Sequence, residues 1–133
     1  MKIPFDIMPF LSYSGCAEEA VNYYISIFPN SKIEEIEYFK EGERGETGKV
    51  KTVIFKLMDK LFLAMDMEKN ECPVQSWQVS FYINCIDEKI FDNILKKLSE
   101  NGTVLMGPES VFNIRKASWV TDKFGITWQI IWE

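Results

Sequence analysis

The sequence predicts an α+β fold built from two βαβββ modules within one domain of 133 residues. Two amphipathic helices carry apolar faces that match at five positions, each 70 residues apart. A strand-like segment precedes each helix, and three strand-like segments follow it. The shared order of elements favours an internal duplication over a chance match between two helix faces.

The first module spans about residues 5–67 and begins with a strand predicted at 9–14. A helix is predicted at 17–28, and it ends where Pro29 and Asn30 interrupt the pattern. Strands are expected at 32–39, 49–57 and 61–67, with a charged, Gly-rich connection at 40–48. The apolar face of the helix consists of Ala20, Val21, Tyr24, Ile25 and Phe28.

The second module spans about residues 76–132, after a connection at 67–75. Its strand is predicted at 77–85, and its helix begins after Asp87 as N-cap and ends at Asn101-Gly102. Strands are expected at 103–107, 116–121 and 126–132. The apolar face of the helix consists of Ile90, Phe91, Ile94, Leu95 and Leu98.

Composition narrows the class of protein. A hydrophobic content of 47% with 26% charged residues is typical of a soluble globular protein. No apolar run approaches the roughly 20 residues of a membrane helix, and the start "MKIPFDIMPF" is a poor signal peptide. We therefore expect a cytoplasmic protein with no membrane partner. A net charge of −5 without a basic stripe argues against nucleic acid as a partner.

The chain contains no histidine, which removes the commonest general base and the commonest ligand of catalytic zinc. The three cysteines form no CxxC pair, so neither a disulfide framework nor a zinc knuckle is predicted. Cys16 lies near a helix start, where a thiolate would be stabilised. Because it has no neighbouring base, we interpret Cys16 as a small buried residue.

Polar residues on the predicted strands are the candidate site. In "ITWQIIW", Trp128 and Ile130 share one side, whereas Thr127 and Gln129 share the other. Gln129 either orients a ligand or a metal-bound water, or is a structural amide bonded to backbone.

Polar residues on two other predicted strands are also candidates for the site. Gln78, Ser80 and Tyr82 form, with Asn84, a polar face opposite an apolar one. Asp66 either is functional, if it faces the same way as Phe62 and Ala64, or is a solvated carboxylate at a strand end.

Two stretches, "GCAEEAVNYYISIFPNSKI" and "WVTDKFGITWQI", closely resemble the signatures of the PhnB-like group of proteins. This group belongs to the vicinal-oxygen-chelate superfamily, with glyoxalase I, the bleomycin-resistance proteins and the extradiol dioxygenases. The resemblance implies that the modules form a curved, incomplete barrel around a central cup, with helices on the convex side. Gln129 would look into that cup. The predicted ligand-binding residues are Asp66, Gln78, Ser80, Tyr82, Thr127 and Gln129.

In metal-bearing relatives, the resemblance implies ligands on the first and last strands of each module. Those positions fall near Pro9, on Asp66, around Trp77 or Gln78, and on Gln129, where Glu is usual. This is a poor donor set, so no metal and no cofactor are predicted. Some members bear a demethylubiquinone methyltransferase label. The only Gly-rich turn, "GERGETG", joins two strands and opens no helix, so that chemistry is not predicted.

The function predicted is that of a small-molecule-binding protein which holds a partly apolar ligand in the cup without a metal. The alternative is a metal-assisted isomerase, lyase or dioxygenase. A homodimer is expected, because open sheets leave edges that need covering. The resemblance also implies dimers, often with modules exchanged between chains.

Overall fold

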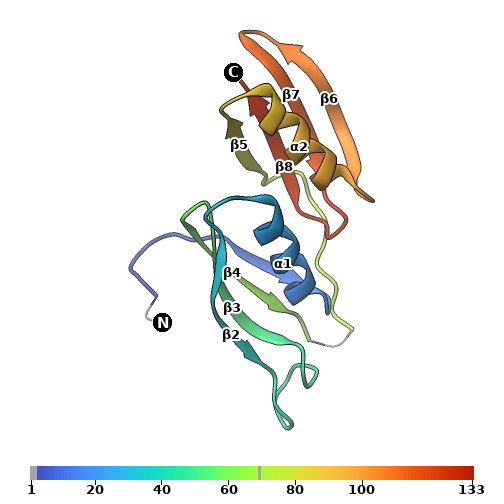
Figure 1. The fold of residues 1–133 in the computed structure, drawn as a ribbon. Coiled ribbons are helices and arrows are strands. Elements are labelled where there is room, and N and C mark those ends of the chain that lie inside the picture. Colours follow the sequence, from blue (N-terminus) through green and yellow to red (C-terminus); the bar gives the residue numbers. More distant parts are fainter. Residues whose placement is uncertain (1–2, 69) are drawn as a thin grey trace. The chain divides into compact units, whose positions relative to one another are not determined.

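A computed structural model describes residues 3–68 and 70–133 (Figure 1). The chain divides into two compact units, Met1–Pro73 and Val74–Glu133. Each unit contains a helix and an open, four-stranded mixed sheet.

The first unit runs β1 (Phe10–Tyr13), α1 (Ala17–Ile27), β2 (Lys32–Tyr38), β3 (Val50–Leu57) and β4 (Lys60–Asp66). Its strand order is β1-β4-β3-β2, in which β1 and β4 are parallel and the other neighbours are antiparallel. The parallel pair needs a crossover connection, and the α1–β2–β3 segment provides it.

The second unit repeats this plan with β5 (Phe81–Cys85), α2 (Glu88–Ser99), β6 (Thr103–Val111), β7 (Ile114–Thr121) and β8 (Thr127–Trp132). Its order is β5-β8-β7-β6, again with one parallel pair between its first and last strands. The predicted α+β fold of two βαβββ modules is therefore confirmed.

Each helix covers one face of its sheet with small and aromatic side chains. Ala20, Val21 and Tyr24 of α1 are fully buried, as are Phe91 and Leu98 of α2, whereas Ile90 is 37% exposed. The N-terminus of α2 is capped as predicted, because the Asp87 carboxylate accepts a hydrogen bond from the backbone N–H of Ile90 at 2.8 Å.

Most strand boundaries lie within two residues of the prediction, and two differ by more. β5 begins at Phe81 rather than at residue 77, because β8 begins only at Thr127 and pairs Trp128 with Phe81. Residues 77–79 therefore have no ladder partner. β6 continues past Gly107-Pro108 to Val111. An edge strand tolerates proline because it has a neighbouring strand on one side only, so the N–H groups on its open side are not needed for pairing.

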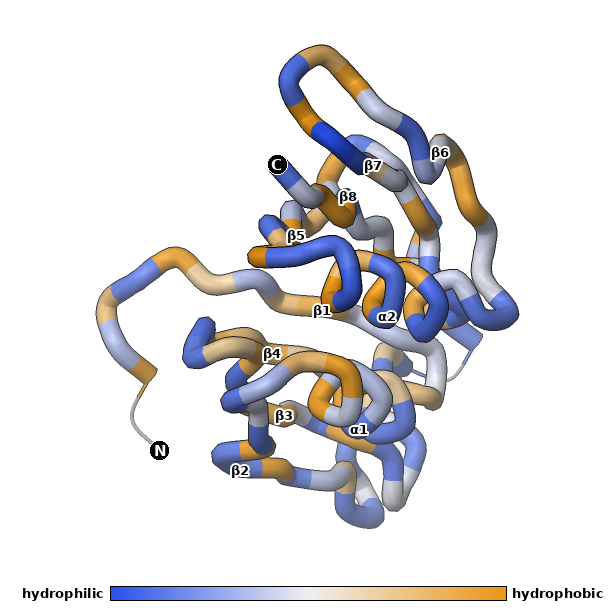
Figure 2. The backbone as a smooth tube through the Cα atoms, turned by 45° about the horizontal axis from the view of Figure 1, so that its top comes forward, coloured by the Kyte–Doolittle hydropathy of each residue, from blue (hydrophilic) through white to orange (hydrophobic). Residues whose placement is uncertain are grey.

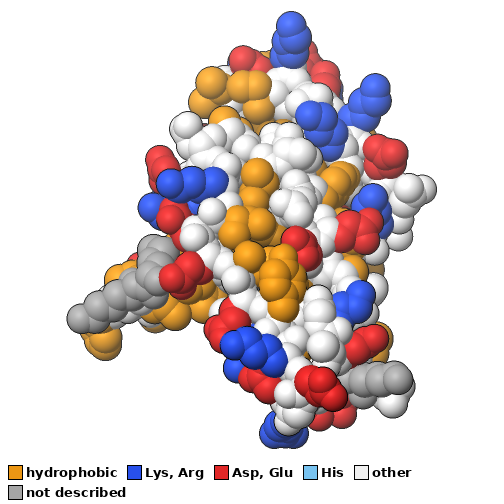
Figure 3. All heavy atoms as spheres, turned by 60° about the horizontal axis from the view of Figure 1, so that its bottom comes forward, with side chains coloured by type: hydrophobic (Ala, Val, Ile, Leu, Met, Phe, Trp, Pro, Cys, Tyr) orange, Lys and Arg blue, Asp and Glu red, His pale blue; other side chains and the backbone are white. Residues whose placement is uncertain are grey.

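Several large apolar side chains remain exposed, and Figure 3 shows hydrophobic patches between acidic and basic ones. The segment before β1 runs away from its sheet in Figure 1, and hydrophobic and hydrophilic residues alternate along it in Figure 2. Phe5 and Ile7 in this segment are almost completely exposed. None of the helices in the described part of the chain is long and apolar enough to cross a membrane.

Candidate functional site

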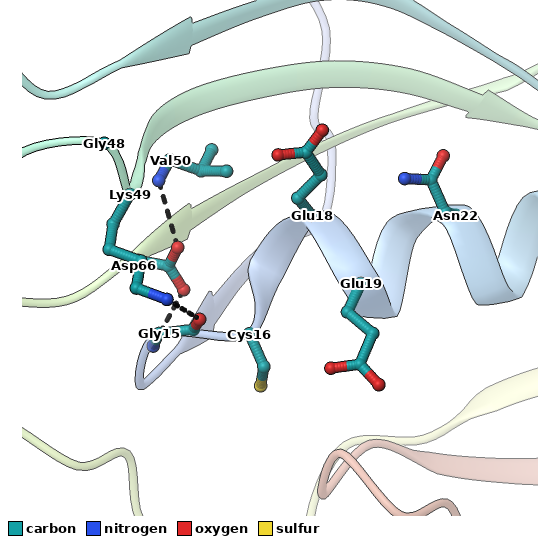
Figure 4. A pocket seen from close by; sticks show the side chains of 9 residues that line it. All are labelled: Gly15, Cys16, Glu18, Glu19, Asn22, Gly48, Lys49, Val50 and Asp66. Carbon is teal, nitrogen blue, oxygen red and sulfur yellow. Dashed lines mark hydrogen bonds between the residues drawn. The ribbon is translucent and has the colours of Figure 1, made fainter.

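Asp66, the last residue of β4, is a buried carboxylate that organises the start of α1 (Figure 4). Its side chain is only 2% exposed. Oδ1 accepts hydrogen bonds from the backbone N–H groups of Gly15 and Ala17, both at 2.9 Å. Oδ2 accepts one from Val50 at 3.0 Å. Asp66 therefore links three chain segments, because hydrogen bonds to a carboxylate are about twice as strong as neutral ones.

Asp66 lies on the face of the first sheet that α1 covers. Its register partner is Tyr13, whose hydroxyl donates to the hydroxyl of Tyr24 on α1 at 3.2 Å. Alternation along β4 puts Asp66 on the same side as Phe62 and Ala64, which was the condition set for a functional role, and its burial rules out the alternative of a solvated carboxylate. That side is the helix side of the sheet.

The register of the two parallel pairs shows which residues correspond between the units. Gln129 on β8 lies opposite Tyr82 on β5. In the first unit the equivalent pair is Met65 on β4 opposite Ser12 on β1. The counterpart of Gln129 is therefore Met65, and Asp66 is one residue further along.

A cavity of about 390 Å³ lies beside Asp66 at the N-terminal end of α1, with Glu18, Glu19 and Asn22 on its helix side (Figure 4). Cys16 also lines it. Burial raises the pKa of the Cys16 thiol, and the charges of Asp66 and Glu19 raise it further. The raised pKa disfavours a reactive thiolate at this helix start, but Cys16 is only partly buried, so the expectation of a small buried residue is met only in part.

The second unit gathers polar and aromatic side chains on the face of its sheet opposite α2. Trp132 of β8 pairs with Lys116, whose Nζ contacts Asp92 of α2 at 2.7 Å. Side chains alternate along a strand, so Gln129 points to the other face. We call this surface the Gln129 face. It consists of Ser80, Tyr82, Trp119, Thr121, Thr127 and Gln129.

Gln129 is held in place by one hydrogen bond. Its Nε2 donates to the Ser80 hydroxyl at 2.8 Å. The described residues form no hydrogen bond to its Oε1. Its two register neighbours, Tyr82 on β5 and Trp119 on β7, are neutral. The Gln129 amide therefore presents a fixed carbonyl acceptor between two aromatic residues.

Trp119, in contrast to Gln129, has a hydrogen-bond donor that lacks an acceptor among the described residues. Its Nε1 atom is buried and has no hydrogen-bond partner among the described residues. An unsatisfied buried donor costs about 1–3 kcal/mol. The ring of Trp77, which lies outside any strand, is 6.2 Å from the ring of Trp119 between centroids. At the turn end of the same face, the buried hydroxyls of Thr121 and Thr127 are 2.9 Å apart and satisfy each other.

Asp122 begins the turn between β7 and β8 and is as buried as Asp66. Its Oδ1 accepts from the backbone N–H groups of Phe124 and Ile126, and its Oδ2 accepts from Nε1 of Trp128 at 2.8 Å. Trp128 is buried on the α2 side. This carboxylate fixes the hairpin that sets Trp119 beside Gln129.

The structure brings together four of the six predicted site residues, namely Ser80, Tyr82, Thr127 and Gln129. Gln78 is exposed in the bend before β5, where its backbone N–H donates to the Ser76 hydroxyl. Asp66 belongs to the other unit and to a helix-covered face. Sequence reasoning missed Trp119 and Thr121 as members of the face. The antiparallel pairing of 114–121 with 127–132 around the turn could have identified both.

The donors present do not fit a divalent metal. Gln129 supplies a neutral amide oxygen, and Met65 occupies the corresponding position of the first unit. Among residues 3–68 and 70–133, no three Cys, Asp or Glu side chains come together in a way that could hold a metal ion. Transition metals in proteins prefer imidazole, thiolate or carboxylate ligands.

The Gly-rich segment does not fit a nucleotide-type cofactor. It connects the antiparallel strands β2 and β3 and opens no helix. Phosphate- and dinucleotide-binding glycine loops act through the N-terminus of a helix that follows a strand. This agrees with the expectation from the sequence that "GERGETG" is a hairpin connection.

Residues 5–131 match the model of a family described as 3-demethylubiquinone-9 3-methyltransferase. A PhnB protein of Bacillus cereus, which bears the same methyltransferase name, is 32% identical with a TM-score of 0.87, covering 96% of this chain and 99% of that one. Among the curated proteins, none matches this chain significantly.

More distant structures share the fold alone. Protein PA1353 of Pseudomonas aeruginosa is 20% identical with a TM-score of 0.84, and 98% of each chain is covered. The fosfomycin resistance protein FosX of Listeria monocytogenes is 8% identical with a TM-score of 0.68, covering 96% of this chain and 92% of that one. A glyoxylase/bleomycin resistance protein/dioxygenase domain of Frankia sp. is 8% identical with a TM-score of 0.65, and 98% of each chain is covered. The chain thus has the glyoxalase/bleomycin resistance fold, and it belongs to the PhnB-like family described as 3-demethylubiquinone-9 3-methyltransferase.

Proposed function

We propose that the protein binds a small, partly apolar molecule on the Gln129 face, with no metal ion as mediator. The observation that carries this proposal is the Gln129 amide, which Ser80 fixes at 2.8 Å while its Oε1 stays unbonded to the described residues. A fixed polar group among aromatic side chains is typical of ligand sites, which are mostly apolar with a few convergent polar atoms.

The neutrality of the site supports binding rather than metal-assisted chemistry. Tyr82, Trp119, Ser80 and Thr127 contribute rings, hydroxyls and an indole N–H, and none of them is an anionic metal ligand. Elemental analysis after gentle purification tests this point. Near-stoichiometric iron, zinc, nickel or manganese would favour the alternative of a metal-assisted isomerase, lyase or dioxygenase.

Binding is tested by screening aromatic fragments against ¹⁵N-labelled protein and following its amide signals. Hits should shift signals of β5, β7 and β8, and Gln129→Ala should weaken their binding about five- to tenfold, the equivalent of one net hydrogen bond. Gln78→Ala is the matched control, because it removes the same side chain from an exposed bend. Equal weakening by both variants would place Gln78 in the site, as the sequence predicted. Fragments that shift only residues of the other unit would contradict the proposal.

We also propose that the chain forms a homodimer. Four edge strands (β1, β2, β5 and β6) and the exposed apolar residues Phe5 and Ile7 support this, because open edges and apolar patches favour association. Light scattering at micromolar concentration should give twice the 15.5 kDa of one chain. The double variant Phe5→Ser/Ile7→Ser should weaken the dimer. Phe112→Ser, which changes an equally exposed ring in the β6–β7 turn, should not.

A further inference from the structure

Two of the four indole N–H groups in the second unit, those of Trp119 and Trp128, differ in whether they have a hydrogen-bond partner. Nε1 of Trp128 donates to the buried carboxylate of Asp122 at 2.8 Å. Nε1 of Trp119 is also buried, but no described residue accepts its hydrogen bond. Nearly all buried polar atoms in native proteins have a hydrogen-bond partner, so a buried donor without one calls for an explanation.

One counterpart to this donor is an acceptor on the neighbouring strand. Trp119 on β7 lies directly opposite Gln129 on β8, and both side chains project from the same face. Side chains in such pairs start about 5 Å apart at Cβ. Because Ser80 takes the Nε2 end of the amide, Oε1 of Gln129 is left as an acceptor.

We propose that this pair recognises an amide group of an aromatic ligand, an inference that rests on the proposed function of the Gln129 face. The ligand carbonyl accepts from Nε1 of Trp119, and the ligand N–H donates to Oε1 of Gln129. A carboxylate ligand fits less well, because it has no N–H to offer to Oε1 and would set two acceptors against each other.

Trp77 gives the ligand a route to the buried Nε1. Its ring contacts that of Trp119, it is 58% exposed, and it lies in a segment without helix or strand. It can therefore move without breaking a hydrogen-bond ladder. In the bound state its ring, with those of Trp119 and Tyr82, provides aromatic surface for the ligand.

The test uses three probes of similar shape: benzamide, with a carbonyl and N–H groups; acetophenone, with a carbonyl only; and ethylbenzene, with neither. Binding is followed by the indole N–H signals of the four tryptophans. We expect benzamide to bind most tightly and to move the Trp119 signal downfield. Trp119→Phe should lower benzamide affinity about tenfold and leave ethylbenzene affinity unchanged.

Trp128→Phe is the matched control, because it removes the same indole atoms from a site where the N–H is already satisfied. It should lower stability but preserve benzamide affinity. Equal benzamide affinity in wild type and Trp119→Phe, with the probes still shifting β5 and β8, would overturn the inference and leave the proposed function standing. If no probe shifts any signal of this face, both fail.

Discussion

Replacing Asp66 with Asn tests whether this buried carboxylate has the structural role inferred from its contacts. The substitution keeps the size of the side chain and leaves Oδ1 able to accept from Gly15 and Ala17. The new amide nitrogen takes the place of Oδ2. It then faces the backbone N–H of Val50, so a donor meets a donor where a 3.0 Å hydrogen bond existed.

The expected cost follows from these contacts. A hydrogen bond to a charged group contributes about 1.5–3 kcal/mol, and a buried donor left unsatisfied adds to the loss. We therefore expect Asp66→Asn to lower the free energy of unfolding by roughly 2–4 kcal/mol. In a chain of this size each kcal/mol lowers Tm by about 4 °C, so Tm should fall by about 8–16 °C.

Urea unfolding followed by circular dichroism measures the loss, and hydrogen exchange localises it. The backbone amides of Gly15, Ala17 and Val50 should lose protection before the rest of the first unit. Asp87→Asn is the control, because Asn caps a helix as well as Asp does, and the change should cost less than about 0.5 kcal/mol. A loss below about 1 kcal/mol for Asp66→Asn, or unchanged protection of Val50, would refute the structural role.

Two further predictions concern the second unit. Gly107→Ala should destabilise by about 2 kcal/mol or more, because a Cβ at φ +77° would lie 2.2 Å from the carbonyl oxygen of Ala117. Gly42→Ala, at φ +89° with nothing within 4 Å, should cost only about 1 kcal/mol in the same urea titration, and equal costs would contradict this account. Burial raises the pKa of Cys85 to about 11, above that of the unfolded thiol. Because the unfolded thiol loses its proton first, the contribution of Cys85 to the free energy of unfolding is complete at neutral pH and is lost as pH rises. The difference in unfolding free energy between wild type and Cys85→Ala should therefore shrink by about 1 kcal/mol between about pH 8 and about pH 10, and a constant difference would contradict the burial of this thiol.

Alternation along the strands predicted which side chains share a face, but it could not identify the face that a helix covers. On β8, Trp128 and Gln129 fall on opposite sides as expected. On β4 both sides are apolar, with Leu63 and Met65 on one and Phe62 and Ala64 on the other. The apolar pattern of β4 therefore did not show whether the side that carries Asp66 faces the helix or faces away from it. The contact between Tyr13 and Tyr24, and the hydrogen bond from Ala17 to Asp66, show that this is the side of α1.

Strand ends were harder to predict because they depend on partners that are distant in the sequence. Gln78 continues the alternation of β5, but the facing residues of the chain form the 122–126 turn instead of a strand. Trp119 was missed as a candidate site residue because a lone aromatic residue on a strand usually belongs to the core. The buried, unpartnered Nε1 that distinguishes it depends on every surrounding group, so no local pattern reveals it.

The stretch "WVTDKFGITWQI" explains why the family can be recognised from the sequence although the function cannot. Most of its polar groups form hydrogen bonds that stabilise the hairpin. Asp122 binds the turn and the indole of Trp128, and Thr121 pairs with Thr127. These contacts build the hairpin itself, so the motif predicts architecture. Two polar atoms of the stretch, Nε1 of Trp119 and Oε1 of Gln129, have no partner in the described part of the chain. Because the hairpin fixes the positions of these two atoms but does not satisfy them, they are the atoms that we propose for ligand recognition.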